Sequence, residues 1–366
     1  MLDKLTIDSF FSIIRLGINH PVNLIPDAID WPIMQDLASK HGLSAIVLDG
    51  VQKLVDNGLL EGGRSMDVAL KKKWIGSVIQ NYEWKYEDYR NSIAKLAEFY
   101  NQHGYRMMVL KGYGLSLNYP IPQHRPCGDI DIWTFGQYRE ADKIISQTLL
   151  IPIDSAHHHH TTFSFNGYLV ENHYDFVNVY YGHRNNSFER VLKELAMDDS
   201  VKTEINGEII YLPSANLNAL FLLRHCMLHF ASTEMSVRQI IDWGLFIENH
   251  TSEIDWPWFL RIIDEYHMMD FFHCLNTICM DDLGFDSSFF PGVEFDSNPT
   301  LKNRVLNDVL TPEFNEVIPT RVLQRILFKY RRWQANAWKQ NLCYGDSRFK
   351  AFWSGVWGHL MKPGMI

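Results

Sequence analysis

Five residues in one short stretch have the types that could handle a phosphorylated substrate: Lys111, Gly112, Arg125, Asp129 and Asp131. Because alternate residues of a strand point to the same face, Asp129 and Asp131 would stand side by side if this segment is extended. Carboxylates held that close repel each other, and either a shared proton or a divalent cation such as Mg²⁺ relieves the repulsion. The spacing therefore predicts a cation site, although Asp-x-Asp also occurs by chance in turns.

Local patterns predict the elements that would hold these residues. Residues 105–110 form a short apolar run typical of a strand, and residues 113–119, after the Lys-Gly pair, favour a short helix. After a proline-rich loop, residues 128–133 alternate polar and apolar side chains, which indicates a half-buried strand. The acidic pair would then lie on the second of two strands.

This layout resembles the polymerase-beta-like nucleotidyltransferase superfamily. More closely, LKGYGLSLNYP followed by R-x-x-GDIDIW is similar to an uncharacterised bacterial nucleotidyltransferase family, and the similarity extends to VENHYD at 170–175 and RQIIDW at 238–243. The resemblance implies an α+β fold, in which a small mixed β-sheet is flanked by N- and C-terminal helical regions.

A third acidic residue lies on a later predicted strand. By the period of two, Glu171, His173 and Asp175 share one face, which in an ordinary edge strand would be a polar face toward solvent. The resemblance implies that Glu171 joins Asp129 and Asp131 as the third catalytic and metal-binding carboxylate. It also implies that His173 is the accompanying histidine, with Asp175 as the fallback third acid.

The resemblance also gives expectations for the nucleotide. Lys111 and Arg125 would contact the triphosphate of a nucleoside triphosphate, and Gly112 would let backbone amides approach it, unless it is only a turn residue. We expect two Mg²⁺ ions, with Mn²⁺ as a substitute.

Histidines occur in two further patterns. The run His157–His160 could place at most two side chains on one ion if it is extended, so we interpret it either as a solvated loop or as a source of one catalytic or phosphate-contacting histidine. Asn166-Gly167 then predicts a hairpin turn. His225 and His229 are four apart on a predicted helix, which favours a hydrogen-bonded pair lining a cleft or ordinary buried histidines over a zinc site.

Arg238 and Asp242 have the same helical spacing. They could bridge on the helix surface, or their helix could pack across the catalytic cleft, as the resemblance implies.

Composition and periodicity set the organisation of the chain. Residues 1–100 read as helices without active-site residue types, residues 101–213 as the mixed core, and residues 214–366 as helices again. The chain contains no run of 18 uncharged apolar residues, and its five scattered cysteines form no Cys-x-x-Cys pair. We therefore expect no membrane span, no zinc knuckle, and reduced thiols in the cytoplasm.

Charge is unevenly distributed. The formal net charge is −9, yet residues 320–366 hold nine of the 34 Lys and Arg residues and only one of the 43 acids, interleaved with aromatics. This tail could form the last helices of the core, a groove for RNA, or a helix lying on anionic lipid.

The predicted activity is transfer of a nucleotidyl group from ATP or another nucleoside triphosphate to a hydroxyl or phosphate acceptor. The acceptor could be a small molecule, a glycan precursor or RNA. Alternatives are phosphoryl transfer by the same site, or a non-catalytic nucleotide-binding or toxin–antitoxin module. From the sequence, Asp131→Asn should leave the fold intact or slightly more stable, because it relieves repulsion within the acidic pair.

Overall fold

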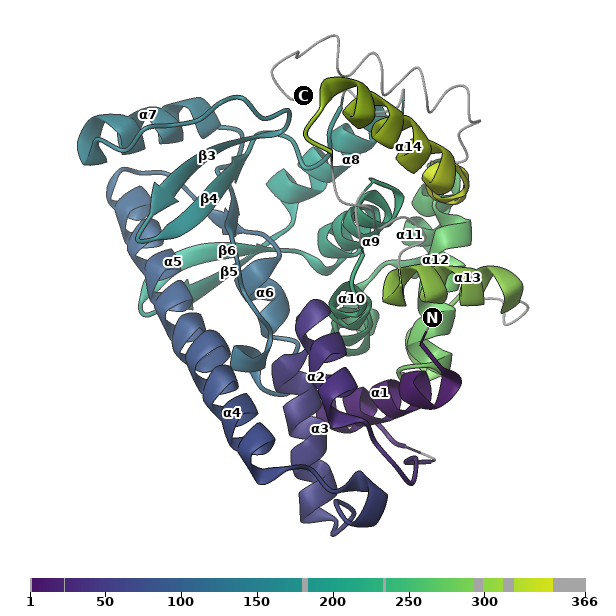
Figure 1. Cartoon of the computed structure of the whole chain (residues 1–366). Coiled ribbons are helices and arrows are strands. Elements are labelled where there is room, and N and C mark those ends of the chain that lie inside the picture. The colour runs from purple at the N-terminus through teal and green to yellow at the C-terminus, as the bar shows by residue number, and fades with distance from the viewer. Residues whose placement is uncertain are drawn as a thin grey trace.

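The computed structural model describes residues 2–22, 24–179, 184–232, 235–292, 299–311 and 319–344. It has an α+β fold, in which one six-stranded mixed sheet lies between a long helical arm and a larger helical body (Figure 1). Within the described part, every helix is too short or too polar to cross a bilayer.

The N-terminal region is helical, as predicted. Its helices are α1 (Lys4–Gly17), α2 (Trp31–Lys40), α3 (Ser44–Asp56), α4 (Val68–Val78) and α5 (Trp84–Gln102), with one π turn at Ile79–Glu83 between the last two. Asp30 accepts a hydrogen bond from the Ile33 amide as N-cap of α2, with Pro32 in the first turn. Gly42 and Gly104 take positive φ angles directly after α2 and α5, a backbone conformation that favours glycine at a helix end.

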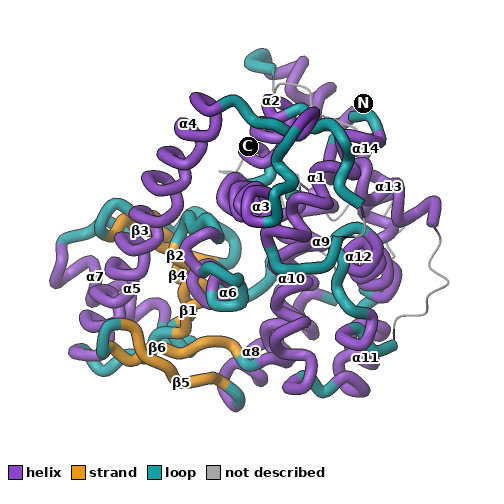
Figure 2. The backbone as a smooth tube through the Cα atoms, turned by 90° about the horizontal axis from the view of Figure 1, so that it is seen from below, coloured by secondary structure: helices purple, strands orange, loops and turns teal. Residues whose placement is uncertain are grey.

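The six strands come from the middle of the chain. They are β1 (Met108–Val109), β2 (Ile130–Trp133), β3 (His160–Phe165), β4 (Tyr168–His173), β5 (Ser200–Ile205) and β6 (Glu208–Pro213), in the order β3-β4-β2-β1-β6-β5. The β2–β4 and β1–β6 pairs are parallel and the others antiparallel. Figure 2 shows the short helix α6 (Gly112–Ser116) beside the sheet, on the side of the helical body.

Two Asn-Gly turns close the hairpins. Asn166 and Gly167 both have positive φ between β3 and β4, which confirms the predicted hairpin. Asn206 and Gly207 repeat this geometry between β5 and β6, a hairpin that we did not predict although its sequence carries the same signal.

Each face of the sheet packs on different helices. One face contributes Ile130, Ile132 and Val170 to a hydrophobic cluster with α5 and with α7 (Tyr138–Leu149). Asp131 alternates with these residues along β2, so its side chain points away from that cluster.

The remaining helices are α8 (Asn185–Asp198), α9 (Ala215–Ser232), α10 (Val237–His250), α11 (Trp256–Glu265), α12 (Met269–Asp281), α13 (Pro299–Leu310) and α14 (Val322–Tyr344).

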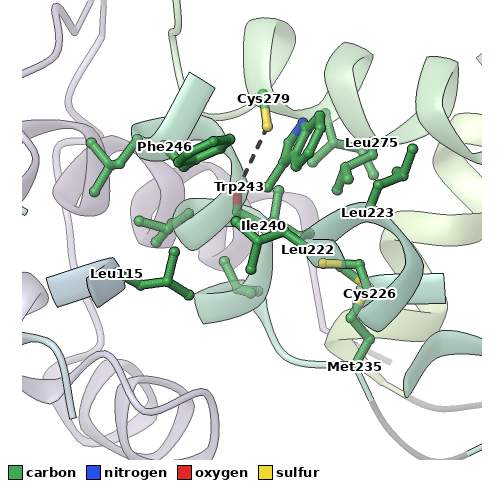
Figure 3. Packing of buried hydrophobic residues seen from close by; sticks show 14 of the residues in the cluster. Leu115, Leu222, Leu223, Cys226, Met235, Ile240, Trp243, Phe246, Leu275 and Cys279 are labelled. Atoms are coloured by element: carbon green, nitrogen blue, oxygen red, sulfur yellow. Dashed lines mark hydrogen bonds between the residues drawn. The ribbon is translucent and has the colours of Figure 1, made fainter. Parts of the chain in front are cut away.

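Helix α10 lies at the centre of the helical body. Figure 3 shows Trp243 and Phe246 of α10 packed among neighbouring helices, with Leu115 of α6 beside them. The Trp243 indole donates to Asn276 Oδ1 at 2.7 Å. The same hydrophobic cluster contains residues of α1–α3 and of α9–α13. The first and last predicted regions thus share a core, while the proposed domain boundaries stay a prediction.

The basic tail packs on the body as far as it is described. Phe328 and Cys343 of α14 are buried, Lys339 forms a buried ion pair with Asp308, and Gln340 donates to the Ala231 carbonyl at 3.1 Å. The interpretation of these residues as core helix is confirmed up to Tyr344. The aromatics Phe349, Phe352, Trp353 and Trp357 lie outside the described residues, so the RNA and lipid interpretations stay open for that part.

Candidate active site

Asp131 and Glu171 occupy matching positions on neighbouring strands. Strands β2 and β4 run parallel with Asp131 opposite Glu171, so both side chains project from the same face of the sheet. All four residues of β2 are buried. The expectation of a half-buried strand was therefore wrong, because its polar face lies in a pocket that residues of the helical regions also line.

Asp131 is held by contacts with Lys111 and His173. Its Oδ1 lies 2.7 Å from Lys111 Nζ and 3.1 Å from His173 Nε2. Burial alone would raise the pKa of Asp131, but the Lys111 ammonium and then His173 hold it well below the usual range. Burial likewise opposes protonation of His173, yet its hydrogen bonds to Asp131 and Glu171 raise its pKa. Asp131 therefore stays ionised at neutral pH.

Asp129 lies just before β2 and is exposed. Desolvation raises its pKa, and the negative charges of Glu171 and Asp131 raise it further. All three carboxylates line one pocket. The structure thus brings the three predicted acids together. It places Asp175 in an ion pair with Lys193 instead.

The turn that carries Lys111 has an unusual backbone. Lys111 has φ 41° and ψ −120°, a conformation that costs about 1–3 kcal/mol in a residue with a side chain. A Cβ at Gly112 would overlap the Tyr89 hydroxyl, which donates to the Asp129 carbonyl at 3.0 Å. Gly112 is therefore required for close packing of this turn against α5, whatever its relation to a nucleotide.

Arg125 is committed to a protein partner. Its Nε and Nη2 donate to the two carboxylate oxygens of Asp242 at 2.7 and 3.0 Å, and its Nη1 donates to the Gly112 carbonyl at 3.1 Å. Tyr119 also donates to Asp242, at 2.8 Å. The surface bridge considered between Arg238 and Asp242 was wrong, since Asp242 is buried and bound to Arg125.

Four further histidines line the pocket, and one of them lies next to Lys111. Lys111 Nζ lies 3.5 Å from His225 Nε2, which lies 3.2 Å from His229 Nε2. Both rings line the pocket, which confirms the hydrogen-bonded pair expected for this helix. His159 and His160 line it too, and His160 is buried. The solvated-loop interpretation of the histidine run was therefore wrong for these two residues.

Burial and nearby cations keep these histidines neutral. Burial first, and then the positive charge of Lys111, lower the pKa of His229 to about 4 and that of His225 well below its usual value. Burial also lowers the pKa of His160 to about 4. Neutral imidazoles offer a lone pair, so they can accept a proton or bind a metal ion.

The pocket has a volume of about 1030 Å³, at the upper end of ligand sites. Its acids lie on the sheet, while four cationic side chains, Lys40, Arg184, Arg224 and Arg238, line other parts of the wall. The Nε atom of Arg238 is buried and makes no hydrogen bond to the described residues. The pocket therefore combines an acidic side with basic groups suited to anions.

Sequence reasoning missed residues supplied by the helical regions. Tyr89 comes from α5, in a region where the sequence showed no active-site residue types. The same region lines the pocket through residues 39–42. Arg224 also lines the pocket, and its guanidinium lies 4.3 Å from the Tyr344 ring centroid. No local signal marks these residues, because only packing brings them to the sheet.

Comparison with known proteins shows the family of the chain. A search of curated proteins found no match. One solved structure, an antigenic nucleotidyltransferase-like protein from Paracoccidioides brasiliensis, aligns with 56% of this chain and 97% of its own at 13% identity. Its TM-score of 0.34 is too low to support an argument. The profile of a family described as "Uncharacterised nucleotidyltransferase" matches residues 27–281, most of the chain. The chain therefore belongs to this family of uncharacterised nucleotidyltransferases.

Proposed function

We propose that the pocket transfers a nucleotidyl group from a nucleoside triphosphate to an acceptor in a metal-dependent reaction. The observation that carries the proposal is the register of Asp131 against Glu171, with Lys111 on Asp131 and Asp129 in the same pocket. These side chains offer carboxylate oxygens for metal ions and an ammonium for phosphate within one pocket.

The donor set suits a divalent cation. Asp131, Glu171 and His173 each offer one ligand atom, and these atoms lie within 4.8 Å of one another. Asp129 adds a carboxylate whose pKa is raised first by burial and then by the negative charges of Glu171 and Asp131. Bound Mg²⁺ would neutralise charge on the phosphates and activate the acceptor oxygen.

In the reaction, the acceptor oxygen attacks the α-phosphorus. A new phosphorus–oxygen bond forms, the bond to the bridging oxygen of the β-phosphate breaks, and pyrophosphate leaves. The acceptor loses its proton to a carboxylate or to water. Lys111 would pair with the triphosphate once it leaves Asp131, because the phosphate offers it an alternative anion.

Labelled nucleotides test this proposal. With Mg²⁺ and ATP labelled at the α-phosphate, nucleotidyl transfer puts the label on the acceptor, whereas phosphoryl transfer does so only with the γ-label. Mass spectrometry of extracts treated with labelled ATP or CTP would then identify the acceptor. Asp129→Asn should abolish the product, while Glu204→Gln, an exposed acid of β5, should not. The proposal fails if no nucleotide gives Mg²⁺-dependent thermal stabilisation or product.

A further inference from the structure

Three imidazoles converge beside the acidic site. His160 begins β3 and lies opposite His173 at the end of β4 in the antiparallel register, and His159 directly precedes it. The ring centroids are 4.4 Å apart for His159 and His160, and 5.2 Å apart for His160 and His173. Each residue offers a nitrogen within 4.8 Å of the other two. Three ligands at this spacing can surround one ion.

These rings leave buried nitrogen atoms without partners. The Nδ1 atoms of His159 and His160 are buried and make no hydrogen bond to any described residue. A buried polar atom without a partner is unfavourable, because it has lost its hydrogen bonds to water. A bound ion would use imidazole lone pairs of this cluster and fix the tautomer of each ring.

Glu171 lies between two of the rings. Its Oε1 is 3.8 Å from His160 Nε2, and its Oε2 is 3.5 Å from His173 Nε2. A carboxylate oxygen can therefore complete a set of three imidazoles. This set differs from the oxygen ligands that Mg²⁺ prefers, and it matches the nitrogen-rich, four-ligand sites of zinc and related ions.

We propose that His159, His160 and His173, with Glu171 at their border, bind a borderline divalent transition-metal ion such as Zn²⁺. The site goes beyond the proposed function, since it uses the histidine run instead of the acidic pair. Two groups of ligands converge here, the three histidines and the set of Asp131, Glu171 and His173, and Asp129 belongs to neither. Glu171 and His173 border both the imidazoles and Asp131. An ion bound here would fix Glu171 beside the acidic pair.

Cobalt provides a spectroscopic test. The full chain, stripped with a chelator, is titrated with Co²⁺ alone, whose visible absorption reports its ligands, and then with Zn²⁺ in competition. We expect saturable binding of one Co²⁺ that Zn²⁺ displaces. His159→Gln and His160→Gln should each weaken it by about tenfold or more. His157→Gln, in the same run but in neither ligand group, should bind like the parent protein.

Two outcomes would overturn the site. One is the absence of saturable Co²⁺ binding by the parent protein, and the other is unchanged binding by the folded His159→Gln variant. Circular dichroism checks folding, and the half-buried His159 keeps the test available if the His160 variant unfolds.

Asp129→Asn separates this site from the proposed reaction. The variant should lose nucleotide turnover and keep Co²⁺ binding, because Asp129 is not among the imidazole ligands. Loss of Co²⁺ binding in Asp129→Asn, with retention in His160→Gln, would assign the ion to the acidic cluster and refute the histidine site. Intact Co²⁺ binding without turnover in the parent protein would instead refute only the proposed function.

Discussion

Arg125 and Asp242 form a two-point ion pair between the loop before β2 and helix α10. The pair joins Nε to Oδ1 at 2.7 Å and Nη2 to Oδ2 at 3.0 Å, and the two residues are only 6% and 5% exposed. Since Arg125 also binds the Gly112 carbonyl, the pair ties the Lys-Gly turn to the helical body. Arg125 therefore positions the site, and it can reach a triphosphate only by releasing Asp242.

Breaking this pair should destabilise the protein. Arg125→Met and Asp242→Leu should each lower the free energy of unfolding by about 3–5 kcal/mol, because each leaves a buried charge unpaired. The double variant should lose clearly less than the sum of the two. Urea denaturation measures all three, with Arg139→Met on the exposed side of α7 as a control. Additivity within about 0.5 kcal/mol would contradict the coupling.

The two aspartates should respond oppositely to loss of charge. Asp131→Asn should destabilise the protein by a few kcal/mol, because Lys111 and His173 lose their buried partner, which reverses the expectation from sequence. Asp129→Asn should be neutral or slightly stabilising, since its carboxylate is repelled by Glu171 and Asp131. Thermal melts in chelator, without metal, compare the two. A stabilised Asp131→Asn variant would contradict the Lys111 contact.

Lys111 should affect nucleotide affinity through its charge, and stability through its backbone conformation. Lys111→Ala and Lys111→Gly should both weaken nucleoside triphosphate binding by about tenfold or more, because both remove a charged hydrogen-bond donor. The glycine variant should be more stable than the alanine variant by up to about 1 kcal/mol, since glycine adopts positive φ without strain. Calorimetric titration and urea denaturation measure the two effects. Equal stability of the variants would argue against strain at this turn.

His41 should make the protein sensitive to acid. Burial, and then the charge of Lys40, lower its pKa from 6.5 to about 4 in the folded state, so the unfolded chain takes up this proton first. The stability is present above pH 6.5 and is lost as pH falls toward 4, by up to about 3 kcal/mol. His41→Gln should flatten this part of the pH profile in urea denaturation, whereas substitution of the exposed His103 should not. If stability falls with pH at the same slope in His41→Gln and in the parent protein, His41 is not the source of the acid sensitivity.

The sequence by itself determined the features that depend on neighbouring residues. Asp30 and Pro32 specify the start of α2, and Asn166-Gly167 specifies a hairpin turn, because the required backbone angles belong to those residues. Because side chains alternate along a strand, the sequence also indicated which neighbouring residues share a strand face with Asp131 and with Glu171. Their motif indicated the family that the profile match then showed.

Only the tertiary structure decided which distant groups meet. Arg125 meets Asp242, and Lys111 meets His225, because α9 and α10 pack against one face of the sheet. Pairing of β4 with β2 and β3 places Glu171 beside Asp131 and buries His160. Side-chain spacing along the chain carries no information on partners more than 100 positions away. The free energy of a buried charge depends on those partners, so the structure leads us to predict the opposite sign for Asp131→Asn from the one expected from the sequence.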